Sequence, residues 1–140
     1  MKALHTLSSA AIVGLLACAP AAAHHSFAAE FDANSPIELT GTVTKVAWAN
    51  PHTFFYIDVE DSGGEIAAWA LELGSPNGLM RRGWTRDSMK IGDMVTVTGW
   101  RAKDGSYKGN ARSVVLSTGK KLFAGTSNEA SGAAAAGRPD

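Results

Sequence analysis

Residues 37–43 read IELTGTV, an alternation of apolar and polar side chains that is typical of a β-strand with one buried face. Beyond this stretch the apolar positions move to Val46 and Trp48, so the alternation changes phase. One extra residue in the strand, at Thr44 or Lys45, would cause this change. The pattern therefore predicts a half-buried strand that contains a β-bulge.

Similar patterns predict four further strands and one short helix. The strands are expected at residues 54–59, 65–73, 94–101 and about 109–116. Ser75 and Pro76 are typical of the N-cap and first residue of a helix, and Gly83 is typical of a helix end. The helix thus lies between the third and fourth strands. This order predicts a mainly β fold, a five-stranded Greek-key barrel of the OB-fold type, with an open α+β sheet as the alternative.

The chain divides into four expected segments. These are a signal peptide at 1–23, an N-terminal arm at 24–36, the barrel domain at 37–123 and a disordered tail at 124–140. The apolar part of the signal, residues 10–17, is shorter than the stretch of about 20 residues that spans a membrane. We therefore expect a periplasmic or secreted protein, cleaved near Ala23 and without a membrane span. A lipid anchor at Cys18 is the alternative.

Charge is balanced over the whole chain but segregated along it. The 13 basic and 13 acidic residues give a net charge of zero, which argues against nucleic acid as the main partner. Residues 24–80 carry eight acidic side chains and one basic, whereas residues 81–121 carry ten basic and three acidic. We interpret this as complementary pairing between the two halves. The alternative is a basic rim that binds an anionic ligand.

Several short motifs together resemble an uncharacterised family of small exported bacterial proteins. The motifs are HHSFAAEFD at 24–32, LTGTV at 39–43, NPH at 50–52, WALELGSP at 69–76, RGWT at 82–85 and GD at 92–93. The resemblance covers residues 24–123 and implies no activity or substrate, because that family is known only as a domain of unknown function. More loosely, the LTGTV strand is similar to one in exported OB-fold proteins linked to stress tolerance.

The histidines suggest a metal site. Cleavage after Ala23 would leave His24 first, so that its amine and imidazole chelate one metal with His25 beside them. A cut after Ala21 would place His24 third, which favours square-planar nitrogen ligation of Cu(II) or Ni(II). We therefore consider copper as a cofactor held by His24, His25 and His52. The alternative is that these histidines are incidental.

Aromatic and basic side chains suggest a ligand-binding face. Phe54 and Tyr56 share the outward phase of the second strand, and Trp100 has that phase in the fourth. OB folds bind sugars or single strands by stacking on such rings. The candidate site consists of Phe54, Tyr56, Trp100, Arg81, Arg82 and Asn50. The alternative is that the rings pack beneath the arm, the helix and the tail.

The sequence contains none of the common catalytic motifs, such as Gly-x-Ser-x-Gly, a phosphate-binding loop or His-Glu-x-x-His. Glu72 and Asp58 have the phase of solvated strand residues, although a buried Glu72 with a raised pKa would be a candidate acid. The first hypothesis is a non-enzymatic, exported binding module for an unknown small molecule, sugar or protein. The second is a periplasmic copper-binding protein, and the third is a small enzyme.

Overall fold

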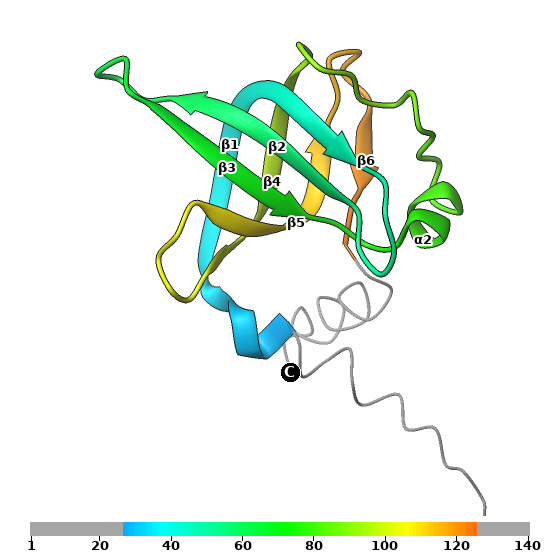
Figure 1. The fold of residues 1–140 in the computed structure, drawn as a ribbon, viewed down its shortest axis with the longest axis horizontal. Helices are drawn as coiled ribbons and strands as arrows, with labels where there is room; N and C mark the ends of the chain where they lie inside the picture. The colour runs from blue at the N-terminus through cyan, green and yellow to red at the C-terminus, as the bar shows by residue number, and fades with distance from the viewer. Residues whose placement is uncertain (1–26, 126–140) are drawn as a thin grey trace, which may run out of the picture.

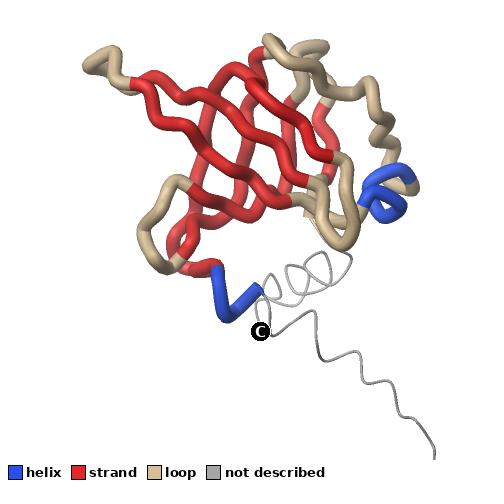
Figure 2. The backbone as a smooth tube through the Cα atoms, viewed as in Figure 1, coloured by secondary structure: helices blue, strands red, loops and turns tan. Residues whose placement is uncertain are grey.

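The structure, a computed structural model, describes residues 27–125 and consists mainly of strands (Figure 1). In chain order the elements are a helical turn at residues 27–30, β1 (Phe31–Ala47), β2 (Phe54–Glu60), β3 (Ile66–Glu72), α2 (Pro76–Met80), β4 (Met94–Ala102), β5 (Lys108–Val115) and β6 (Lys121–Phe123). The expected mainly β fold with short helices is confirmed (Figure 2). Within this described range, no helix is both long enough and apolar enough to cross a membrane.

The six strands form one sheet in the order β3-β2-β1-β4-β5-β6. Each neighbouring pair in this order is antiparallel. In addition, β3 pairs with β5 in parallel, with Ala70 opposite Lys108 and Glu72 opposite Asn110. Strand β3 therefore has a partner on each side, and five of the strands are linked in a closed series of pairings.

The expected number of five strands is wrong, because β6 adds a sixth. This strand has three residues and pairs with the end of β5, with Ser113 opposite Phe123. It is too short to produce an alternation that can be recognised in the sequence. Ala124, expected to begin the tail, is buried, and its N–H donates to Arg112 O at 2.8 Å. Residues 126–140 of the expected tail and the expected signal peptide lie outside the described residues.

Strand β1 begins at Phe31, six residues before the strand expected from the alternation. Phe31 is 2% exposed and lies opposite Ala102 of β4, and the register then shifts before Pro36. The intervening residues are polar or small, so the sequence shows no alternation there. The last part of the expected arm is therefore part of the sheet.

The interior is formed by the side chains that the alternation assigned to it. The fully buried residues include Phe55, Ile57, Leu71 and Val97, and Ile37 and Leu39 pack against them. The expected bulge in β1 is confirmed, because the pairing with β2 shifts between Val43 and Lys45. The hydroxyl of Ser75 accepts from Gly78 N at 3.2 Å, with Pro76 at the start of α2. Leu79 then anchors this helix in the core.

A second bulge lies between β4 and β5. Thr98 is opposite Ser113 and Gly99 is opposite Ala111, so Arg112 is an extra residue in β5. A Cβ atom on Gly99 would lie 2.0 Å from Asn110 O, which is far inside any allowed contact. Only a glycine therefore fits where β4 passes this bulge.

Candidate functional site

Four outward side chains form one row across four strands. Phe54 of β2 is opposite Glu72 of β3, Glu72 is opposite Asn110 of β5, and Asn110 is opposite Trp100 of β4. Opposed residues of paired strands point to the same face of a sheet. Their chain neighbours Phe55, Leu71 and Ala111 belong to the buried core, so this row points outward. We call Phe54, Glu72, Asn110 and Trp100 the outer row.

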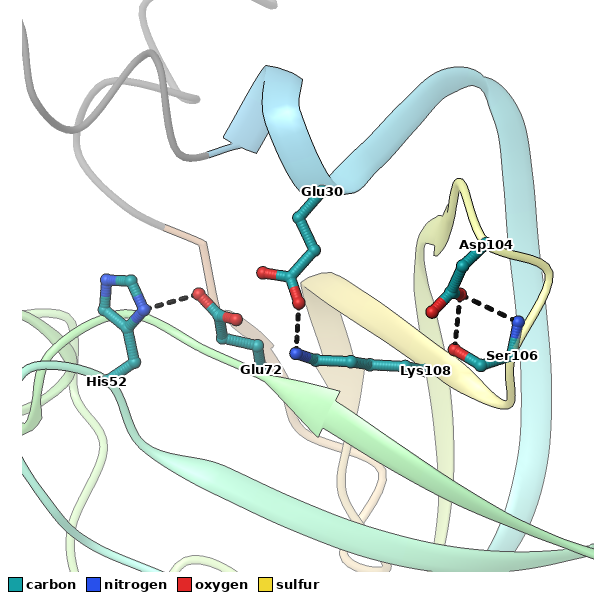
Figure 3. A network of polar contacts seen from close by, with 6 residues as sticks. All are labelled: Glu30, His52, Glu72, Asp104, Ser106 and Lys108. Carbon is teal, nitrogen blue, oxygen red and sulfur yellow. Dashed lines mark hydrogen bonds and ion pairs between the residues drawn. The ribbon is translucent and has the colours of Figure 1, made fainter.

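Glu72 is buried, which corrects the expectation that it is solvated. It is 7% exposed, and its carboxylate contacts Nδ1 of His52 from the loop between β1 and β2. Figure 3 shows this carboxylate between the ring of His52 and the pair formed by Glu30 and Lys108. The expectation failed because burial here depends on the helical turn and on β5, which are distant in sequence.

Burial is the largest influence on Glu72, and it raises the pKa of this carboxyl above its ordinary value of 4.5. The nearby carboxylate of Glu30 also raises the pKa, whereas the contacts with His52 and the charge of Lys108 lower it. Glu72 is therefore a carboxyl group that holds its proton more tightly than a solvated one. It can accept a hydrogen bond, or donate one when protonated.

Lys108 links the outer row to the helical turn. Its ammonium group contacts the carboxylate of Glu30, and lies 5.8 Å from the ring centroid of Phe54 and 5.9 Å from that of Phe31. A cation at this distance is attracted to the face of each ring. These contacts hold Glu30, and with it the turn at residues 27–30, beside the row.

Trp100 lies at the other end of the row. The ring of Phe27 meets it edge to face, with centroids 5.4 Å apart and planes at 84°. The guanidinium of Arg112 lies 5.8 Å from the centroid of Trp100. The indole therefore lies in contact with both the helical turn and the bulge in β5.

Asn110 provides a polar atom without a partner. The residue is 3% exposed, and its Oδ1 is buried without a hydrogen-bond donor among the residues that the structure describes. Leaving such an acceptor unsatisfied costs about 1–3 kcal/mol. A bound molecule that donates a hydrogen bond would remove this cost.

The other residues predicted for the ligand site lie around the row or elsewhere. Tyr56 is two residues along β2 from Phe54, and Nζ of Lys45 lies 5.2 Å from the ring centroid of Tyr56. Asn50 is exposed in the loop before His52. Arg81 is exposed after α2, whereas Arg82 donates to Gly125 O at 2.9 Å and lies 4.8 Å from the ring of Phe123. Glu30, Lys108 and Asn110 lie in or beside the row but carry no signal in the sequence pattern.

Of the histidines predicted to bind metal, His52 lies against Glu72, and His24 and His25 lie outside the described residues. Between residues 27 and 125, no three side chains of the metal-ligating types are close enough to hold a metal ion. A metal site at His52 would therefore need ligands from outside this range.

A family model described as a family of unknown function (DUF6152) matches residues 13–111. The chain belongs to this family. The match confirms the resemblance to an uncharacterised domain. It includes all four residues of the outer row and ends within β5, at residue 111. No curated protein matches the chain.

The raised pKa of Glu72 determines the sign of a pH dependence in this family member. The folded state holds this proton more tightly than the unfolded chain does. The contribution of Glu72 to the free energy of unfolding should therefore fall as the pH rises from about 4.5 through the raised pKa. In the Glu72→Gln variant this fall should be absent, so the variant should gain stability relative to wild type across that window. Urea denaturation at several pH values, with a chelator present, measures the difference.

Asp104 provides a control of opposite sign. Hydrogen bonds from the hydroxyl and the backbone N–H of Ser106, at 2.6 and 2.9 Å, lower the pKa of Asp104 from its ordinary value of 3.8. Its stabilising contribution is therefore present above that value and is lost as the pH falls. Asp104→Asn should lose stability relative to wild type as the pH rises. Parallel pH profiles for Glu72→Gln and wild type would contradict the argument for Glu72.

Proposed function

We propose that the chain is an exported, non-enzymatic binding module, and that β1, β2, β3, β5 and β4 form a barrel of the OB-fold type. The parallel pairing of β3 with β5, which joins the two ends of this series, supports the barrel. The position of α2 between β3 and β4 agrees with the same fold. OB folds bind their ligands over the second and third strands, which here carry Phe54 and Glu72.

We propose a sugar as the ligand of the outer row. The observation that carries this proposal is the buried Oδ1 of Asn110, which has no hydrogen-bond partner within residues 27–125. It lies on the strand next to Glu72, and Glu72 in turn lies on the strand next to Phe54. A sugar ring offers hydroxyl donors for the two acceptors. It also offers an apolar C–H face that packs on an aromatic ring. The row matches both chemical features within one patch.

Binding to an array of immobilised neutral and acidic oligosaccharides tests this proposal. We expect the wild type to bind at least one class of sugar, and Phe54→Ala to lower the affinity about tenfold, which corresponds to about 1.4 kcal/mol. The matched control is Tyr107→Ala, which removes an exposed ring in the turn between β4 and β5. The absence of binding to every sugar, or equal losses in the two variants, would contradict the proposal.

Copper binding is the second candidate, and one contact favours it. Histidines that bind metals commonly donate their other ring N–H to a carboxylate, as Nδ1 of His52 does to Glu72. Figure 3 shows the second ring nitrogen on the side away from Glu72. In the chain, His24 and His25 are separated from the turn that bears Glu30 by one residue, Ser26. His24, His25 and His52 would hold the metal through nitrogen ligands, which Cu(II) prefers.

A titration of the processed chain, beginning at its natural N-terminus, with Cu(II) distinguishes copper binding from sugar binding. If copper is the ligand, titration with Cu(II) should show a site that is lost in both His24→Ala and His52→Ala. Binding that is unchanged in His52→Ala would rule out a site that includes this histidine.

A further inference from the structure

A shallow groove lies over the outer face of β4, β5 and β6, beyond Trp100. It consists of two hollows of about 360 and 420 Å³ that share Thr98 and Arg112 in their walls. Ligand sites commonly have volumes of about 300–1,000 Å³. The polar, basic and aromatic side chains in the walls include Thr98, Trp100, Arg112, Ser113, Lys121 and Phe123.

The bulge in β5 explains why these side chains gather here. Arg112 is the extra residue, so it and Ser113 both point outward in succession, while Ala111 and Val114 remain in the core. The carbonyl of Arg112 accepts from Ala124 N at 2.8 Å, which satisfies the backbone of the bulge. Bulges redirect side chains in this way next to binding sites. Here the bulge brings the guanidinium of Arg112 over the ring of Trp100.

The groove carries a net positive charge, with two basic side chains and one acidic side chain in its walls. In the part of the chain that the structure describes, Lys108 is the one Lys or Arg in an ion pair with a carboxylate, so the expected pairing between the acidic and basic halves is limited there to the single contact of Lys108 with Glu30. Arg112 and Lys121 in the groove walls therefore face solvent without an ion-pair partner in that range. Glu38 is the one acidic residue in the walls.

The remaining polar groups also suit an anionic ligand. The hydroxyls of Thr98 and Ser113 are 2.8 Å apart, so one donates to the other and one O–H remains free to donate to a ligand. A guanidinium binds a carboxylate with two parallel hydrogen bonds. Trp100 and Phe123 supply an aromatic ring in each hollow, against which the apolar face of a sugar can pack.

We propose that this groove binds a carboxylate-bearing sugar unit, and that the ligand of the module is therefore an acidic oligosaccharide. Trp100 belongs both to the outer row and to the groove, so one chain of sugar units can occupy both. This inference rests on the proposed sugar binding at the outer row. It adds the charge of the ligand and a second set of contacts made by Arg112 and Lys121.

Calorimetry with galacturonic acid hexamer and with the neutral hexamer of glucose tests the proposal on the full mature chain. We expect the acidic hexamer to bind about tenfold more tightly than the neutral one. Arg112→Gln and Lys121→Gln should each remove most of this preference for the acidic hexamer. The matched control Lys120→Gln removes the same charge one residue before Lys121 and should leave the preference intact.

The outcomes separate this inference from the proposed function. Equal affinities for the two hexamers, or a preference that survives both groove variants, would overturn the inference while Phe54→Ala still reported on the outer row. Tighter binding of an oligothymidylate than of the acidic hexamer would overturn it in favour of phosphate recognition. Binding of neither hexamer would overturn both proposals. The use of two separate groove variants covers the case in which one of them fails to fold.

Discussion

The Phe55→Ala variant is expected to lose about 3–5 kcal/mol of unfolding free energy, the usual range for removing a buried phenylalanine ring. Phe55 is 1% exposed and lies opposite Val46 of β1 and Leu71 of β3, at the centre of the core. Denaturation in urea, followed by tryptophan fluorescence, measures the loss as a lower midpoint concentration.

Phe54→Ala provides the control, because it removes the same ring one residue earlier. Phe54 points outward, where it lies near the ammonium group of Lys108 instead of packing in the core. We expect this variant to lose about 1 kcal/mol or less, as most surface substitutions do. Equal losses in the two variants would show that both rings belong to the core, and would remove Phe54 from the proposed site.

Gly99→Ala is expected to destabilise the fold by about 3 kcal/mol, the upper part of the usual range for overpacking. The new Cβ would lie 2.0 Å from Asn110 O and 3.1 Å from Ala111 Cα, so two backbone segments would have to separate. The bulge at Arg112 would then shift as well. Thermal denaturation measures the loss of stability, and we also expect weaker binding of an acidic sugar.

Gly63→Ala is the control for this variant. Gly63 lies in the turn between β2 and β3, and its Cβ would meet only the carboxylate of Asp61, at 3.2 Å, and no backbone atom of another strand. Its stability should change by less than about 0.5 kcal/mol. A Gly99→Ala variant as stable as Gly63→Ala would mean that β4 and β5 do not pass each other as closely as the structure has them.

Local patterns were sufficient to predict most of the sheet. The alternation in residues 37–43 and its change of phase near Thr44 identify a strand and its bulge, because both depend on neighbours in sequence. The turn at residues 61–64 sets the register that puts Phe54 opposite Glu72. The closeness of these two side chains was therefore open to prediction, although the burial of Glu72 was not.

The rest of the site depends on contacts between segments that are distant in sequence. Asn110 reaches Glu72 only through the parallel pairing of β3 with β5, and no periodicity in either strand indicates its partner. Glu30 reaches Lys108 only because the helical turn folds back over the row. Arg112 points outward because it is the extra residue of a bulge, and the sole sequence signal of this bulge is Gly99 in the opposite strand.

The most direct test of the outer row as the binding face is a nuclear magnetic resonance titration of the isotope-labelled protein with the galacturonic acid hexamer. The account predicts that the backbone amides of Phe54, Glu72 and Asn110 show the largest shift changes. Unchanged amides at these three positions, with shift changes gathered instead around the exposed side chains of Ile66 and Ile91, would contradict it.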